Sequence, residues 1–565
     1  MRMTALAFLI GSVLACPAIA ADPAPTAIDA IFSQWTAKTP GVALAIVRDE
    51  KVIYSHGYGL ASLEHQVPIT TNTVFDVGST SKQFTAASIL LLAEDGKLDL
   101  TDDIRKYFPD LPQYQSPITI AHLLHHTSGL RDYTDVMNLG DLSIESNYPV
   151  SSLLKIIFRQ KALNFPPGEQ FSYSNTGYFL LGEIVHKVSG MPLSRFAKAR
   201  IFEPLGMAST LFMDDHLAII PHRASSYFPR DDGNGLQMCI SLMDNVGDGG
   251  VYTTVEDLAK WDANFYHNKL GAGKPEFLDQ MHKVGLLNNG QPIGYASALF
   301  IGTHRGQKMV FHGGAWQGFR AEMVRFPALR LSVICLANLG TTDATALALQ
   351  VADLYLPKDG SHNAIPSGTT ATATPSAAPT FAIPEADWAK FPGRYKADSG
   401  SIWTLTRSGD QLAILSTSGL RFAARPIGAL EFESTDRPQR ARLVFDMDAD
   451  GKIAGITQTM ADTPDVHLKA MDAMTDLAAG LSDFEGMYDS DEAGGWMSVT
   501  ASGGQLRIKH FEGFDAYPVG RDEPNTFSVP GLELVFTRGS DGQVDGIIVN
   551  KPRTKGIRYV KRPAC

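Results

Sequence analysis

The pattern of hydrophobic and polar residues shows two strand-like runs near the start of the chain, in the segment 41–59, GVALAIVRDEKVIYSHGYG. A charged turn joins the runs, and this pattern predicts a pair of antiparallel strands. Strand-like patterns return at 309–327, MVFHGGAWQGFRAEMVRFP, and at 331–338, LSVICLAN, while helical periodicity fills the chain between. Strands at both ends with helices between them predict an α+β domain whose first and last strands are neighbours in one antiparallel sheet.

A change of composition follows this domain. Residues 366–380, PSGTTATATPSAAPT, are only small, polar or proline residues and cannot contribute to a packed core. They predict a linker between a large N-terminal domain and the rest of the chain. The expected division is a leader at 1–20, a catalytic domain at 21–360, a linker at 361–384, and two further domains at 385–478 and 479–565.

The two C-terminal segments repeat one pattern. The run Phe391-Pro392-Gly393-Arg394-Tyr395 returns 93 residues later as Phe484-Glu485-Gly486-Met487-Tyr488. Leu-Val-Phe followed by Asp-Gly also occurs in both segments, at 443–451 and 534–542. Short alternating runs broken by Gly-Asp or Gly-Gly turns, as in SIWTLTRSGDQLAIL, are typical of small antiparallel barrels or sandwiches. We expect two tandem copies of one module, each a β-barrel.

Composition and charge narrow the function classes. The chain has 565 residues and a net charge of -11, and it has no basic run, which disfavours a nucleic-acid partner. The first 20 residues combine Arg2, an apolar segment and Ala18-Ile19-Ala20, the pattern of a secretory signal peptide, so a periplasmic or secreted protein is expected. An alternative is a lipid anchor at Cys16. No later apolar run is long enough for a transmembrane helix.

The remaining cysteines and a histidine cluster give weaker signals. Three cysteines follow the leader, at widely scattered positions that make neither a disulfide framework nor a metal-ligand spacing: Cys239, Cys335 and Cys565. Three histidines lie close together in HLLHHTSGL, namely His122, His125 and His126. No nearby carboxylate completes a ligand set, so we expect no metal and no cofactor.

The stretch 74–92, VFDVGSTSKQFTAASILLL, carries the first candidate chemistry. Ser79 follows a glycine, and Lys82 stands three positions later, just before an apolar run that predicts a helix. Residues three apart share one helix face, so the amine can reach the hydroxyl and act as its base. The base must first lose its proton, which desolvation and nearby positive charge favour. The same pattern fits the polar start of a buried helix. Ser152 and Lys155 repeat the spacing in 150–158, VSSLLKIIF, where we expect Ser151 or Ser152 to be an ordinary helix cap and Lys155 a solvated residue.

Two further motifs could complete an acyl-transfer site. Tyr173-Ser174-Asn175 precedes an apolar helical run; the tyrosine hydroxyl can pass a proton to a leaving group, and the asparagine amide can hold a substrate carbonyl. His312-Gly313-Gly314 lies on a predicted strand, where the two glycines let a substrate backbone approach the strand edge. Each motif has a decoy, Tyr266-His267-Asn268 and His304-Arg305-Gly306, so neither decides alone.

The motifs taken together, in this order and over residues 30–345, resemble the serine β-lactamase and penicillin-binding protein superfamily. The match includes STSK, YSN and HGG, with LLHHTSGL (123–130) and GDGGVYTTVEDLAKW (247–261) between them. It is most similar to the class C-like branch of D-aminopeptidases, D-alanyl carboxypeptidases and family VIII esterases. An enzyme domain followed by two β-domains resembles the D-aminopeptidases, in which the barrels cover the cleft and restrict substrates to small ones.

The resemblance implies a role for each motif residue. Ser79 would be the acylated nucleophile, Lys82 its base and Tyr173 a second base or proton shuttle. Asn175 would bind the substrate amide, and His312, Gly313 and Gly314 would form the substrate-binding strand. The backbone amides of Ser79 and Ala315 would form the oxyanion hole. Ser152 has no place in this arrangement.

One departure from the family bears on the substrate. The penicillin-binding branch usually has Lys-Thr-Gly where this chain has His312-Gly313-Gly314, and a neutral imidazole without a neighbouring hydroxyl should hold a substrate carboxylate weakly. This favours a peptide recognised by its amino end, or an ester, over a β-lactam.

The expected function is therefore an exported serine hydrolase acting on small peptides or amides of D-amino acids. A carboxylesterase, a weak β-lactamase or a D-alanyl carboxypeptidase of the same fold are alternatives. A penicillin-binding sensor that is acylated without turnover is the alternative from another class. The expected partner is a small molecule or short peptide, and the sequence leaves homo-oligomerisation open.

Overall fold

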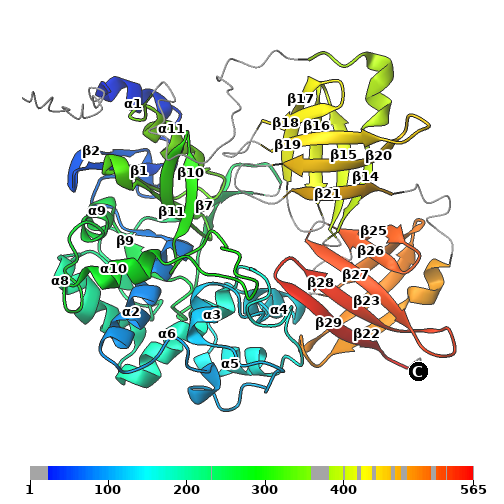
Figure 1. The fold of residues 1–565 in the computed structure, drawn as a ribbon, viewed down its shortest axis with the longest axis horizontal. Coiled ribbons are helices and arrows are strands. Elements are labelled where there is room, and N and C mark those ends of the chain that lie inside the picture. The colour runs from blue at the N-terminus through cyan, green and yellow to red at the C-terminus, as the bar shows by residue number, and fades with distance from the viewer. Residues whose placement is uncertain are drawn as a thin grey trace, which may run out of the picture.

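The chain folds into an N-terminal domain followed by two barrels (Figure 1). The predicted signal peptide at 1–20, the alternative lipid anchor at Cys16, most of the predicted linker at 361–384 and Cys565 lie outside the described part of the chain. The computed structural model describes residues 23–230, 232–357, 381–398, 401–416, 421–435, 441–459, 465–471, 480–510, 517–529 and 531–563.

A six-stranded antiparallel sheet forms the centre of the N-terminal domain, in the order β10-β11-β12-β13-β1-β2. The first strand, β1 (Val42–Arg48), pairs with the last, β13 (Leu331–Ala337), in the register Val42↔Ala337 to Arg48↔Leu331. The prediction that the first and last strands are neighbours is therefore confirmed. The other strands of this sheet are β2 (Lys51–Tyr58), β10 (Phe300–His304), β11 (Gln307–Trp316) and β12 (Phe319–Phe326).

Helices cover both faces of this sheet, which explains why β1 is apolar at nearly every position. Leu44 and Ile46 pack into a core shared with α1 (Pro25–Ile31) and α11 (Ala344–Asp353). Ala43 and Ala45 face the opposite core, shared with α2 (Lys82–Glu94), α6 (Asn175–Ser189) and α9 (Val255–Asn264). Because successive strand side chains point to opposite faces, both sets must be apolar.

Shorter elements complete the N-terminal domain. The remaining α-helices are α3 (Ile120–Leu124), α4 (Tyr133–Leu139), α5 (Val150–Phe158), α7 (Leu193–Ala197), α8 (Glu203–Leu205) and α10 (Pro275–His282), with single turns η1 (Gly78–Ser81), η2 (Ile104–Lys106), η3 (Lys198–Phe202) and η4 (Pro327–Leu329). Two- and three-stranded sheets use β3 (Leu60–Ser62), β4 (Val67–Pro68), β5 (Phe75–Asp76), β6 (Leu211–Phe212), β7 (Ser226–Pro229), β8 (Leu236–Cys239) and β9 (Val251–Thr253). No helix among the described residues is long and apolar enough to cross a bilayer.

The repeated segments form two closed eight-stranded antiparallel barrels, which confirms the prediction of tandem barrels and decides against sandwiches. The turn η5 (Glu385–Lys390) precedes the first barrel, made of β14 (Gly393–Ala397), β15 (Ile402–Ser408), β16 (Gln411–Ser416), β17 (Arg421–Gly428), β18 (Glu431–Ser434), β19 (Arg442–Met447), β20 (Ile453–Thr459) and β21 (Val466–Ala470). The turn η6 (Leu481–Phe484) precedes the second, made of β22 (Gly486–Ser490), β23 (Gly495–Ser502), β24 (Gln505–Lys509), β25 (Tyr517–Glu523), β26 (Thr526–Val529), β27 (Leu532–Arg538), β28 (Val544–Lys551) and β29 (Thr554–Lys561).

The repeated Phe-x-Gly-x-Tyr motif does the same structural task in each barrel. In the first barrel the hydroxyl of Tyr395 donates to the carbonyl of Phe391 at 3.0 Å, and both side chains are buried. In the second, the hydroxyl of Tyr488 donates to the carbonyl of Phe484 at 2.6 Å. The hydrogen bond gives the buried phenol a partner while fastening the entry turn to the first strand, so the motif recurs wherever the module recurs.

The two barrels pack differently against the rest of the molecule. The buried side chains of the second barrel form one continuous core with those of the N-terminal domain, whereas the first barrel has a core of its own. In Figure 1 the second barrel lies beside α4 and α5. The second barrel is thus the one placed to influence the helical part of the N-terminal domain.

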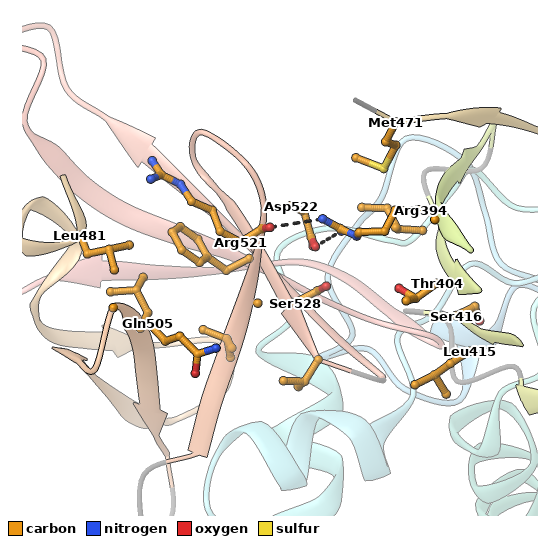
Figure 2. Close-up of a pocket in the computed structure, with 18 of the residues that line it drawn as sticks. Arg394, Thr404, Leu415, Ser416, Met471, Leu481, Gln505, Arg521, Asp522 and Ser528 are labelled. Atoms are coloured by element: carbon orange, nitrogen blue, oxygen red, sulfur yellow. Dashed lines mark hydrogen bonds and ion pairs between the residues drawn. The ribbon is translucent and has the colours of Figure 1, made fainter. Parts of the chain in front are cut away.

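A cavity of about 810 Å³ lies between the barrels (Figure 2). Arg394 of β14 reaches across it, forming an ion pair with the buried carboxylate of Asp522 on β25 and donating to the carbonyl of Arg521 at 3.2 Å. A charge-assisted pair with a buried partner fixes the barrels to each other more firmly than an exposed pair would.

Candidate active site

The nucleophile candidate lies where the sequence predicted, at the start of a buried helix. The turn η1 contains Ser79, and α2 begins at Lys82. Asp76 at the end of β5 accepts a hydrogen bond from the amide of Gly78 at 2.8 Å, and its burial raises its pKa to about 7. Gly78 has a positive φ of 48°, which glycine tolerates best. This turn presents Ser79 at the N-terminal end of α2.

Lys82 is fully buried and its amine makes three contacts. The Nζ atom lies 3.1 Å from Ser79 Oγ, 2.9 Å from Asn175 Oδ1 and 2.6 Å from the carbonyl oxygen of Asp248. Three acceptors match the three hydrogens of an ammonium group. The same geometry places the lone pair of a neutral amine within reach of the Ser79 hydroxyl, as a general base requires.

Tyr173 and Asn175 flank the start of α6 and face the lysine. The Tyr173 ring centroid lies 4.9 Å from Lys82 Nζ, and its buried hydroxyl has no hydrogen-bond partner among the described residues. A buried hydroxyl without a hydrogen-bond partner is uncommon and indicates a functional role. The backbone amide of Asn175 donates a hydrogen bond to Asp132 Oδ2 at 2.7 Å, which fixes the beginning of α6.

The motif HHTSG supports Tyr173 and holds no metal-ligand set. His126 is buried, accepts a hydrogen bond from the Ser174 amide at 3.1 Å, and packs against the Tyr173 ring with 4.2 Å between centroids. Burial lowers the pKa of His126 well below its ordinary value. His122 closes a capping box with Thr119 at the start of α3. Across the described ranges, no group of three or more His, Cys, Asp or Glu side chains is arranged for a metal ion.

His312 is held as a neutral ring inside the protein. Its Nδ1 lies 2.6 Å from the carbonyl of Gly313 and its Nε2 lies 3.1 Å from the hydroxyl of Tyr295. Since a carbonyl only accepts, Nδ1 carries the proton, and Nε2 accepts from the tyrosine. Burial lowers the pKa of His312 to about 3. The neutral imidazole expected from the sequence is therefore present, and both of its nitrogens are engaged within the protein.

Strand β11 lies against η1 through two glycines. A Cβ on Gly314 would stand 1.9 Å from the carbonyl oxygen of Val77 and 3.0 Å from the amide nitrogen of Ser79. A Cβ on Gly78 would stand 2.6 Å from the amide nitrogen of Ala315. The two backbone amides expected to form an oxyanion hole are thus brought to the same place, and only glycine permits this approach.

This close approach leads to a testable expectation for Gly314. Replacing it by alanine should push β11 away from η1, separate the two amides, and lower kcat/KM by about 30-fold because an oxyanion contact is lengthened. Gly302 on β10 is the matched control, since a Cβ there would meet only Phe311 at an ordinary 3.5 Å. Steady-state kinetics of Gly314→Ala and Gly302→Ala measure the difference. Equal activities would show that the amide spacing does not matter.

A cavity of about 590 Å³ opens beside Ser79. Besides Ser79, its walls come from the segment just before α6, from strands β10 to β12 and from the loop that leads into α11. The lining residues are Tyr173, Phe300, Phe311, His312, Gly313, Gly314, Ala315, Arg320, Ala321, Glu322 and 341–345. The cavity is large enough for a dipeptide-sized molecule.

The structure also shows residues that the sequence did not single out. Asp132, Asp248 and Tyr295 contact the predicted residues directly, and Arg553 reaches the same region from the second barrel. Asp248 lies within the quoted GDGG motif, so a signal for it was present. Arg553 is distant in sequence from every motif, and no local pattern indicates it. Ser152 and Lys155 lie on α5, and Lys155 is exposed, as expected. The N-cap of this helix is Pro149, without a side-chain hydrogen bond, so the interpretation of Ser151 or Ser152 as the helix cap is wrong.

Comparisons with known proteins identify the family of the N-terminal domain. The sequence model of a family described as Beta-lactamase matches residues 28–356. Penicillin-binding protein 4* of Bacillus subtilis is 30% identical over 404 residues, covering 67% of this chain and 85% of that protein. D-aminopeptidase of Brucella canis is 24% identical over 544 residues, covering 92% of this chain and 96% of that protein. The octameric penicillin-binding protein homologue from Pyrococcus abyssi shares the fold, with a TM-score of 0.54 and 23% identity over 79% of this chain and 98% of that one.

Proposed function

The chain belongs to the beta-lactamase family, and from this premise we propose that it is an exported serine hydrolase that cleaves small peptides or amides of D-amino acids through an acyl-enzyme. The observation that carries the proposal is the 3.1 Å contact between Lys82 Nζ and Ser79 Oγ beside an open cavity. The similarity to a D-aminopeptidase over 92% of the chain, both barrels included, supports the substrate class. The leader pattern at 1–20 supports export.

Acylation would begin with attack of Ser79 Oγ on the substrate carbonyl carbon. The hydroxyl proton moves to Lys82 Nζ, the carbonyl π electrons move to its oxygen, and the amides of Ser79 and Ala315 donate to that oxyanion. The tetrahedral intermediate then collapses, the C–N bond breaks, and the Tyr173 hydroxyl gives its proton to the departing amine. Lys82, whose Nζ lies 4.9 Å from the centroid of the Tyr173 ring, then returns a proton to Tyr173.

Hydrolysis of the acyl-enzyme would reverse these proton transfers. A water takes the place of the departed amine, gives a proton to the Tyr173 and Lys82 pair, and attacks the ester carbonyl. The C–O bond to Ser79 then breaks, and the serine oxygen takes the proton back. We assign the transfer of the water proton to the Tyr173 hydroxyl, which is buried and makes no hydrogen bond among the described residues.

The strand motif favours a substrate without a carboxylate next to the scissile bond. A lysine at position 312 would present a cation to such a carboxylate, but here a neutral ring is bound on both nitrogens. A carboxylate that enters beside His312 would gain no ion pair from this ring. For this physical reason we favour an aminopeptidase or amidase activity over a carboxypeptidase or β-lactamase activity.

A panel of four substrates tests the proposal. We expect the mature protein to hydrolyse a D-alanine anilide with a kcat/KM at least about 100-fold above that of the L-enantiomer, with poor turnover of a chromogenic cephalosporin. Hydrolysis of a short-chain nitrophenyl ester with neither anilide cleaved would instead identify an esterase. Stable acylation by the cephalosporin without turnover of any substrate would identify a penicillin-binding sensor. Efficient cephalosporin turnover would contradict the argument from His312.

A further inference from the structure

The hairpin between β28 and β29 of the second barrel contacts the N-terminal domain at Asp132, just before α4, and at Asn164. The carbonyl of Arg553 in its turn accepts hydrogen bonds from the amide of Asp132 at 3.2 Å and from Asn164 Nδ2 at 2.9 Å. The hydroxyl of Thr554 donates to the carbonyl of Asp132 at 3.3 Å. The turn is therefore fixed at the N-terminus of α4.

Buried polar contacts around the turn make this docking rigid. Arg131 Nη1 pairs with Glu492 Oε1 of the second barrel at 2.5 Å, with side chains only 2% and 8% exposed. The same guanidinium donates to the carbonyls of Lys555 at 2.8 Å and Gly556 at 3.0 Å. Opening the interface would leave a buried charge without its partner, which is strongly unfavourable.

A short chain of contacts runs from Arg553 to the catalytic lysine. Arg553 Nη1 lies 3.3 Å from Asp132 Oδ2, and this carboxylate is fully buried. The same oxygen accepts a hydrogen bond from the backbone amide of Asn175 at 2.7 Å. The side-chain oxygen of the same residue, Asn175 Oδ1, lies 2.9 Å from Lys82 Nζ. The charge on the barrel is thus two residues away from the base.

The groups around the Arg553 guanidinium define its electrostatic setting. Burial lowers its pKa, but the surrounding acids, above all Asp132 and Asp135, raise it above its ordinary value, so it is always charged. Its neighbours come from every element packed against it: Asp132, Thr134 and Asp135 of α4 and its cap, Tyr133 of α4, His126 after α3, Tyr173 before α6, Asp248 before β9 and Lys551 of β28.

We propose that Arg553 is a positioning residue which the second barrel contributes to the active site. Its charge balances the buried Asp132 carboxylate, so that this carboxylate does not hold a proton on Lys82 or Tyr173, and it keeps Asn175 in place. The inference deepens the proposed function and rests on it for the roles of Lys82 and Tyr173. It makes the second barrel a part of the catalytic apparatus and not only a cover.

The sign of the effect can be derived from the charges. With Arg553 removed, Asp132 adds an uncompensated negative charge near the base, and protonated forms are favoured. With Asp132 removed and Arg553 kept, the balance reverses. The acidic limb of the kcat/KM profile reports the protonation of the base in the free enzyme. The two substitutions should therefore move this limb in opposite directions, which a merely structural role for the pair would not do.

The test uses the full-length mature protein with four variants. We expect Arg553→Met to lower kcat/KM about 10-fold at neutral pH and to move the acidic limb up by about one pH unit, and Asp132→Asn to move it down. Arg553→Lys, which keeps the charge, should move it much less. Lys555→Met removes a cation from an exposed side chain of the same hairpin and should leave the profile unchanged.

A second readout separates this inference from the proposed function. The rate at which a fluorophosphonate labels Ser79 is measured against pH in every variant, and this needs no knowledge of the natural substrate. Labelling of the wild type without anilide hydrolysis would overturn the proposed function, and the pH dependence of the labelling rate would still give the acidic limb. An unshifted limb in Arg553→Met, or a shift of the same sign in Asp132→Asn, would overturn the inference. Should Arg553→Met fail to fold, the direction of the shift in Asp132→Asn decides.

Discussion

Replacing Ser79 by alanine is expected to lower kcat/KM by about 10⁴-fold or more, to the limit of detection, while the protein stays folded. The hydroxyl is the only atom of this side chain that the mechanism uses, and no covalent intermediate can form without it. The substitution removes one oxygen from a small side chain whose backbone amide, the proposed oxyanion donor, is retained. A loss of this size corresponds to about 5.5 kcal/mol of transition-state stabilisation.

The decoy serine supplies the matched control for this experiment. Ser152→Ala changes a serine with the same spacing to a lysine, on α5, and should leave kcat/KM within about twofold of the parent. Mass spectrometry of protein treated with a fluorophosphonate should show one adduct in the parent and in Ser152→Ala, and none in Ser79→Ala. Activity above a trace in folded Ser79→Ala would remove Ser79 from the role of nucleophile.

Sequence reasoning succeeded where the chemistry is local. Ser79 and Lys82 are three residues apart on one helix face, so their spacing alone predicts the contact that the structure shows. The Phe-x-Gly-x-Tyr repeat likewise predicted two modules, because each copy makes its own short-range hydrogen bond. The same local reasoning could not choose between Ser79 and Ser152. The order of several motifs decided between them, and the structure brings Tyr173 to Lys82.

The residues that sequence reasoning missed are those whose role comes from tertiary contact. Asp132 reads as an ordinary helix cap, and it does cap α4, but one of its oxygens also accepts from Asn175. Arg553 reads as a charged residue in a hairpin turn. Its importance arises only because the second barrel closes and docks, a long-range event with no signature in the surrounding sequence. The predicted domain boundaries at 360, 384 and 478 fall at or near segments outside the described residues and stay predictions.

The second large effect is expected from Lys82→Met, which keeps the length of the side chain and removes its amine. Without the amine, Ser79 loses the group that takes its proton, and the Tyr173 hydroxyl makes no hydrogen bond among the described residues that would let it replace the lysine. We expect kcat/KM to fall about 10³-fold, somewhat less than for Ser79→Ala, because the nucleophile and the oxyanion amides remain.

The physical consequence for the fold should differ from the consequence for activity. Lys82 is fully buried, and its three acceptors include Asn175 Oδ1 and the carbonyl of Asp248, which the methionine leaves without this donor. Removing the buried amine relieves its desolvation but leaves two acceptors without a donor, so the melting temperature should change by only a few degrees, about 5 or less. Lys155→Met, at an exposed position on α5, is the matched control and should retain full activity. Slow Ser79 labelling in a folded Lys82→Met protein would confirm a base; labelling at the parent's rate would show that another group activates the serine.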